Sequence, residues 1–139
     1  MSDARARARR IFQVLVVDDD PAMLLMVRTM LERDSRLHVV SEALNGHDAV
    51  ALAERMCPDA VIIGMQMPFM DGITAASLIK RVCPSTSVVI FSAVTTTTLV
   101  QKAFDSGVDL YLSKTTRPTE LVDAINGLCA RAARLSETA

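Results

Sequence analysis

One stretch of this 139-residue chain indicates the fold most clearly: Val14-Leu15-Val16-Val17-Asp18-Asp19-Asp20-Pro21. Its aliphatic run ends abruptly in three carboxylates, and a proline follows at once. Such a run predicts a strand that is buried on both faces, as in a parallel sheet covered by helices. Asp20 followed by Pro21 predicts the N-cap and the first position of a helix. The stretch therefore predicts a strand, a loop and a helix, with acidic side chains at the carboxyl end of the strand.

The same alternation continues along the rest of the chain. Four further apolar runs are separated by segments in which apolar residues recur every three or four positions, as on one face of a helix. These runs are Leu37–Val40, Ala60–Ile63, Val88–Phe91 and Val108–Leu112. Strands that alternate with helices in this way predict parallel crossovers. The fold class is therefore α/β, a (βα)5 flavodoxin-like three-layer sandwich with a five-stranded parallel sheet.

Length and charge predict one domain with short ends. Residues 1–10 contain Arg5, Arg7, Arg9 and Arg10, whereas the whole chain has a net charge of -1. We expect a basic disordered arm at 1–10, one domain at 11–132, and a tail or the start of a linker at 133–139. The basic start precedes no apolar core of a signal peptide, and no apolar run approaches the ~20 residues of a membrane helix. This pattern predicts a cytoplasmic protein without membrane contact.

The three cysteines give no signature of a structural site. Cys57, Cys83 and Cys129 are odd in number, far apart and without a C-x-x-C spacing. This arrangement indicates neither a zinc site nor a disulfide framework. We therefore expect Cys57 and Cys83 to fill apolar gaps at helix ends.

Chemically active side chains follow the predicted strands. Asp18 and Asp19 end the first run, Ser92 ends the fourth, and Lys114 follows the fifth. In an open parallel sheet, ligands bind at the carboxyl ends of the strands. Carboxylates favour a hard divalent cation, a hydroxyl can bond a phosphoryl oxygen, and a lysine can neutralise its charge. The set describes a magnesium-assisted phosphoryl site that lacks a nucleophile.

Together these motifs resemble the receiver domains of two-component response regulators over roughly residues 11–132. Asp18 and Asp19 match the acidic pair of that family, and Ser92, Tyr111 and Lys114 match its hydroxyl, its aromatic switch and its lysine. The loop that follows the third strand in the family is matched by Met67-Pro68-Phe69-Met70-Asp71-Gly72. Thr115 stands where many receivers have proline after the lysine, which is similar to receivers joined to LuxR-type helix-turn-helix domains.

The resemblance implies a phosphoacceptor aspartate at the end of the third strand, and this chain has Gly64 there. Moving the register by one residue breaks every flanking match. A glycine has no side chain with which to form an acyl phosphate or to bind magnesium. We therefore expect a degenerate acceptor position, no required cofactor, and at most weak or vestigial Mg²⁺ binding at Asp18 and Asp19. Lys114 is expected to pair with Asp18 or Asp19 instead of with a phosphoryl group.

The leading hypothesis is an atypical, non-enzymatic receiver that acts as a phosphorylation-independent interaction or dimerisation module and controls a transcriptional output. The resemblance implies a homodimer through the fourth helix, fifth strand and fifth helix. A DNA-binding domain would lie outside these residues. The alternatives are a phosphorelay receiver with a substitute acceptor (Asp18, Asp19 or Ser92), or a glycine introduced at position 64 to block phosphorylation. A haloacid-dehalogenase-like phosphatase is disfavoured because nothing acidic follows Lys114 until Glu120.

Overall fold

The computed structural model describes residues 10–138, whose strands form one parallel sheet in the order β2-β1-β3-β4-β5. The strands are β1 (Phe12–Val17), β2 (Leu37–Ala43), β3 (Ala60–Ile63), β4 (Ser87–Ser92) and β5 (Leu110–Ser113). Each predicted apolar run lies in or overlaps one of these strands, and the run Ala60–Ile63 has the predicted bounds. The basic arm expected at 1–10 lies outside the described residues except for Arg10, whose guanidinium is 3.4 Å from Asp59.

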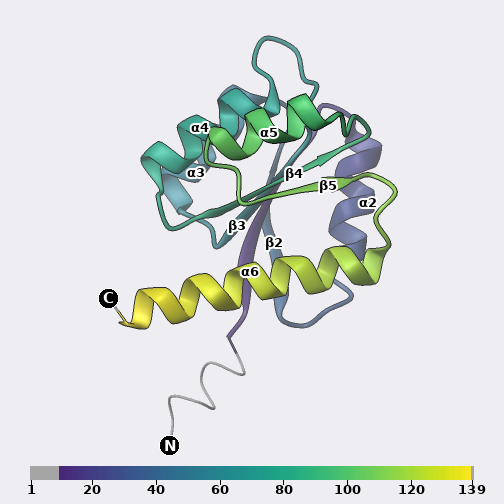
Figure 1. The fold of residues 1–139 in the computed structure, drawn as a ribbon. Coiled ribbons are helices and arrows are strands. Elements are labelled where there is room, and N and C mark those ends of the chain that lie inside the picture. Colours follow the sequence, from purple (N-terminus) through teal and green to yellow (C-terminus); the bar gives the residue numbers. More distant parts are fainter. Residues whose placement is uncertain (1–9, 139) are drawn as a thin grey trace, which may run out of the picture.

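Helices cover both faces of the sheet, as Figure 1 shows. They are α2 (Pro21–Leu31), α3 (Gly46–Met56), α4 (Gly72–Val82), α5 (Thr97–Asp105) and α6 (Pro118–Thr138). Helices α2 and α6 enclose one core together with Val14 and Val16. Helices α3, α4 and α5 enclose the other core together with Leu15 and Val17. Successive residues of a strand thus enter opposite cores, which explains why the central strands β1, β3 and β4 are apolar along most of their length and confirms the three-layer α/β fold.

Short polar residues start the helices that follow the first three strands. Asp20 accepts a hydrogen bond from the Ala22 N–H at 2.9 Å, so it caps α2 as predicted. Asn45 caps α3 in the same way, and Asp71 caps α4 through the Thr74 N–H at 2.8 Å. Each cap satisfies a backbone N–H that the first helical turn leaves without a partner. These caps fix the loops at the carboxyl edge of the sheet.

The structure corrects the prediction for two cysteines. Cys57 and Cys83 form a disulfide with an S–S distance of 2.08 Å and a Cα–Cα distance of 5.6 Å. They lie at the C-terminal ends of α3 and α4, two helices that pack against each other on one face of the sheet. Sequence spacing carries no sign of this meeting, because it depends on how the two helices are aligned in space. At the chain end, residues 133–138 continue helix α6.

Candidate functional site

The predicted site residues lie at the edge of the sheet where the strand order changes direction. The chain passes from β1 to β2 on one side and then returns to β3 on the other side of β1. Asp18 follows β1, Gly64 follows β3, Ser92 ends β4, and Lys114 follows β5. The carboxyl ends of neighbouring parallel strands lie at one edge, and a crevice at the change of order is the usual ligand position. The structure thus brings the predicted residues to one edge of the sheet.

Asp18 is the best-held carboxylate of this edge. The residue is only 7% exposed, so its charge requires partners. Its Oδ1 accepts a hydrogen bond from the Asp20 N–H at 3.0 Å, and its Oδ2 lies 3.3 Å from Lys114 Nζ. Asp19 is exposed beside it. The predicted pairing of Lys114 with one of the two acids is therefore present, and the partner is Asp18.

Gly64 faces the Asp18 carboxylate directly. Its N–H donates to the Val17 carbonyl at 2.9 Å, and a Cβ built on Gly64 would lie 2.9 Å from Asp18 Oδ2. Any side chain at this position would consequently extend into the acidic site, and Asp18 would have to move slightly to admit it. The neighbouring Gly72 has a different reason to be glycine, because its Cβ would lie 2.2 Å from the Gly64 carbonyl oxygen. The close approach of the two backbones fixes the start of α4 against the end of β3.

Ser92 and Tyr111 both bind the backbone of Val94. Ser92 is 3% exposed, and its Oγ accepts a hydrogen bond from the Val94 N–H at 3.0 Å. The Tyr111 hydroxyl donates to the Val94 carbonyl oxygen. The Lys114 N–H in turn donates to the Ser92 carbonyl at 2.9 Å. The loop after β4 is therefore held by hydrogen bonds to both the N–H and the carbonyl oxygen of Val94.

The acidic site opens onto a shallow hollow beside the loop after β3. The hollow measures about 510 Å³ and is lined by Asp19, Met65, Gln66, Met67, Pro68 and Asp71. Next to it, Phe69 is 99% exposed and has a positive φ of 68°, a conformation that side chains with a Cβ seldom adopt. Sequence reasoning did not single out Phe69. The sequence feature that could have pointed to Phe69 is an aromatic residue in a turn-forming loop of a chain with few aromatic residues.

The residues present do not make a complete magnesium site. The family resemblance implies carboxylate ligands for Mg²⁺, and here Asp18 and Asp19 lack a third carboxylate because Gly64 has no side chain. One oxygen of Asp18 is already paired with Lys114. Within residues 10–138, no group of three or more His, Cys, Asp and Glu side chains is placed to hold a metal ion. The donor set thus falls short of the six or more oxygens of a typical hard-cation site, most of which water would have to supply.

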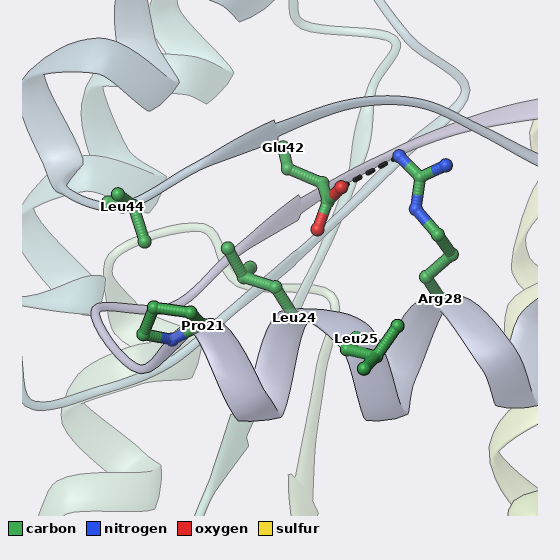
Figure 2. A pocket seen from close by; sticks show the side chains of 6 residues that line it. All are labelled: Pro21, Leu24, Leu25, Arg28, Glu42 and Leu44. Carbon is green, nitrogen blue, oxygen red and sulfur yellow. Dashed lines mark ion pairs between the residues drawn. The ribbon is translucent and has the colours of Figure 1, made fainter.

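A second hollow lies between α2 and the edge strand β2, and sequence reasoning did not predict it. Figure 2 shows its six lining residues, which are Pro21, Leu24, Leu25, Arg28, Glu42 and Leu44. The hollow measures about 410 Å³, and Arg28 spans it with an ion pair of 2.8 Å to Glu42. Leu25 is 65% exposed and Leu44 is 49% exposed. The available signal was the run of consecutive apolar residues Leu24, Leu25 and Met26, which one face of a helix cannot bury together.

Fold and site together define a receiver domain. The family model described as "Response regulator receiver domain" matches residues 14–126, and the chain belongs to this family. The response regulator protein VraR of Staphylococcus epidermidis is 34% identical over 113 residues, which cover 81% of this chain and 54% of VraR. VraR of Staphylococcus aureus is 33% identical over the same length. The chain thus spans about half the length of the curated relatives it matches.

Solved structures agree with this assignment. The receiver domain of the putative response regulator NarL from Mycobacterium tuberculosis superposes with a TM-score of 0.82 at 31% identity, over 88% of this chain and 98% of that one. A LuxR-family response regulator from Aurantimonas also gives 0.82, at 30% identity and 86% coverage of both chains. The chain is therefore a receiver domain of two-component signalling with relatives in the LuxR family. None of the described helices has the length and hydropathy needed to span a membrane.

Proposed function

We propose that this domain signals without aspartyl phosphorylation, as an interaction or dimerisation module that controls a transcriptional output. The observation that carries the proposal is the geometry of Gly64. The residue follows β3, where the family resemblance puts the acceptor aspartate, and its missing side chain would extend toward Asp18. Without a carboxylate there, no acyl phosphate can form at this position. Gly64 is thus a degenerate acceptor position that cannot be phosphorylated.

Lys114 binds a carboxylate of the domain itself in place of a phosphoryl group. It neutralises Asp18 at 3.3 Å and joins the end of β5 to the end of β1. Ser92 and Tyr111 keep the places of the family's hydroxyl and aromatic switch but hold Val94 instead of a phosphoryl group. These contacts stabilise one conformation of the pocket. A change to another conformation would then depend on the binding of a partner and not on phosphorylation. Mg²⁺ binding through Asp18 and Asp19 is weak or vestigial, and no cofactor is required.

Two of the three substitute acceptors, Asp18 and Ser92, are already engaged by other groups. Asp18 is buried and engaged with both Lys114 and the Asp20 N–H. Ser92 is buried with its hydroxyl bonded to Val94. In-line attack on a phosphodonor requires a nucleophile that reaches the donor in the correct orientation. A phosphatase reading also lacks support, since Glu120 lies beyond the start of α6 and is exposed. We therefore expect no enzymatic activity.

The interaction surface is proposed to be α5, β5 and α6, which correspond to the fourth helix, fifth strand and fifth helix of the sequence prediction. Phe104 on α5 is 43% exposed, an apolar side chain suited to a contact between subunits. The output would be a DNA-binding domain outside these residues. Support comes from the Aurantimonas relative, which is described as a two-component response regulator of the LuxR family and is 30% identical. The proposed location is the cytoplasm.

Sedimentation equilibrium with and without a small phosphodonor and Mg²⁺ tests this proposal. We expect the same dimerisation constant under both conditions. In the Phe104→Asp variant we expect the affinity of the dimer to fall at least about tenfold, because a charge replaces an apolar contact. Leu25→Asp is the matched control, since Leu25 is an exposed apolar residue on α2. Dimers that form only with the phosphodonor would contradict phosphate independence. Dissociation by Leu25→Asp alone would contradict the assigned surface.

A further inference from the structure

The disulfide between Cys57 and Cys83 lies at the edge of the sheet opposite the acidic site. Cys57 ends α3 and is followed by Pro58, and Cys83 ends α4 and is followed by Pro84. Both cysteines precede the strands β3 and β4, whereas the acidic site follows these strands. The bond therefore joins the ends of two helices at a distance from the residues considered so far.

The two cysteine residues differ in their exposure to solvent. Cys57 is an exposed residue, whereas Cys83 is 1% exposed. Cys57 also has a left-handed backbone, with a φ of 40°. Exposed disulfides are the ones that exchange with thiols, because the attacking thiolate must approach one sulfur along the bond. This bond can be approached from the Cys57 side and is shielded on the Cys83 side.

The surroundings of Cys83 also suit the reduced form. The carbonyl oxygen of Ala53 lies 3.1 Å from the Cys83 sulfur. In the disulfide that sulfur has no hydrogen to donate, but a Cys83 thiol would have an S–H with an acceptor already in place. A buried donor with a partner avoids the cost of an unsatisfied polar group. A Cys83 thiol therefore has a hydrogen-bond acceptor close by when the bond is reduced.

We propose that Cys57 and Cys83 form a reversible dithiol–disulfide site that exchanges with small-molecule thiols and disulfides through Cys57. In reduction, an external thiolate attacks the Cys57 sulfur, the Cys57–Cys83 bond breaks, and Cys83 leaves and takes up a proton. A second external thiolate then attacks the mixed disulfide and releases the Cys57 thiol, so that one small-molecule disulfide forms for each protein disulfide reduced. Oxidation by a small-molecule disulfide runs through the same steps in reverse. The two electrons pass between the protein pair and the reagent pair, and no other reactant is needed.

Intact mass spectrometry after equilibration with reduced and oxidised glutathione tests the site. Thiols are alkylated after acid quenching and denaturation, so the reduced chain carries three labels and the oxidised chain only the label on Cys129. We expect a smooth change from three labels to one as the glutathione ratio changes. Three labels at every ratio would show that the bond does not form. One label at every ratio would show a permanent structural bond and would overturn reversibility.

Single-cysteine variants identify the exchanging sulfur. In Cys83→Ser we expect a glutathione adduct on Cys57, and in Cys57→Ser we expect at least tenfold less adduct on the buried Cys83. Equal adducts would overturn the assignment of Cys57. A measurement on the unaltered chain serves if a variant does not fold: alkylation of the native reduced protein, followed by peptide mapping, is expected to label Cys57 first. We also expect the oxidised form to melt on the order of 10 °C higher, because the bond closes a loop across 26 positions.

Discussion

Lys114 Nζ lies 3.3 Å from Asp18 Oδ2, although 96 positions separate the two residues along the chain. The contact joins β1 to β5, strands that are not neighbours in the sheet. The Asp18 side chain is 10% exposed and the Lys114 side chain 30% exposed, so solvent screens the pair only in part. Lys114 therefore neutralises the charge of Asp18 in the absence of a phosphoryl group.

We expect Lys114→Ala to lower the free energy of unfolding by about 1 kcal/mol at neutral pH, because it leaves a mostly buried carboxylate without its cation. Urea denaturation measures the change. In an Asp18→Asn background the same substitution should cost clearly less, since the charge to be neutralised is gone. A Lys114→Ala protein as stable as the original at neutral pH would refute the role given to this pair.

Tyr111→Phe and Ser92→Ala test whether the loop after β4 is held through Val94. Each variant removes one hydrogen bond to the Val94 backbone and is expected to cost about 1 kcal/mol. The two bonds act on one residue, so the double variant should cost less than the sum of the single variants. Strict additivity in denaturation experiments would argue that the two side chains act on separate parts of the loop.

Gly72→Ala is expected to destabilise the domain by about 3 kcal/mol, because the new Cβ would lie 2.2 Å from the Gly64 carbonyl oxygen. Gly127→Ala in α6 is the matched control. Apart from the chain neighbours and the adjacent helix backbone, no atom lies within 4 Å of its added Cβ, so the change should stabilise the helix by up to about 1 kcal/mol. Thermal unfolding of both variants measures the contrast. A well-tolerated alanine at position 72 would contradict the close contact of the two backbones.

Cys129 is expected to resist alkylation in the folded protein between pH 7 and 9. Burial in the core, with a smaller effect of Asp59, raises the pKa of its thiol to about 12. A raised pKa keeps the thiol protonated, and alkylation requires the thiolate. Stability linked to this thiol is complete below the unfolded-state pKa of about 8.5 and is lost as the pH rises toward 12. Time-resolved labelling of a Cys57→Ser/Cys83→Ser protein measures the reactivity, and modification as fast as in urea would contradict it.

The fold could be predicted because each strand carries its own signal. Both cores need apolar residues from every strand, so β3 stands out in the sequence as the run Ala60–Ile63 with its observed bounds. The carboxyl ends of parallel strands share one edge, so the proximity of Asp18, Gly64 and Lys114 also followed from the pattern. Only the family resemblance identifies position 64 as the place where a phosphoacceptor aspartate is expected.

Features that depend on distances between distant elements could not be predicted. The disulfide forms only because the ends of α3 and α4 are brought within 5.6 Å at their Cα atoms. The hollow between α2 and β2 depends on which way Leu25 and Leu44 point after packing. The choice of Asp18 over Asp19 as the partner of Lys114 depends on side-chain directions, which neighbouring residues on a loop do not reveal.

Intact mass after incubation with a small phosphodonor and Mg²⁺ shows whether Gly64 alone removes the capacity for phosphorylation. The chain itself should gain no phosphoryl group, whereas the Gly64→Asp variant should gain one once Asp18 shifts to admit the new side chain. Gly64→Asn, which is similar in size but not a nucleophile, should remain unmodified. Stoichiometric phosphorylation of the unaltered chain would contradict the account and would require the modified residue to be mapped.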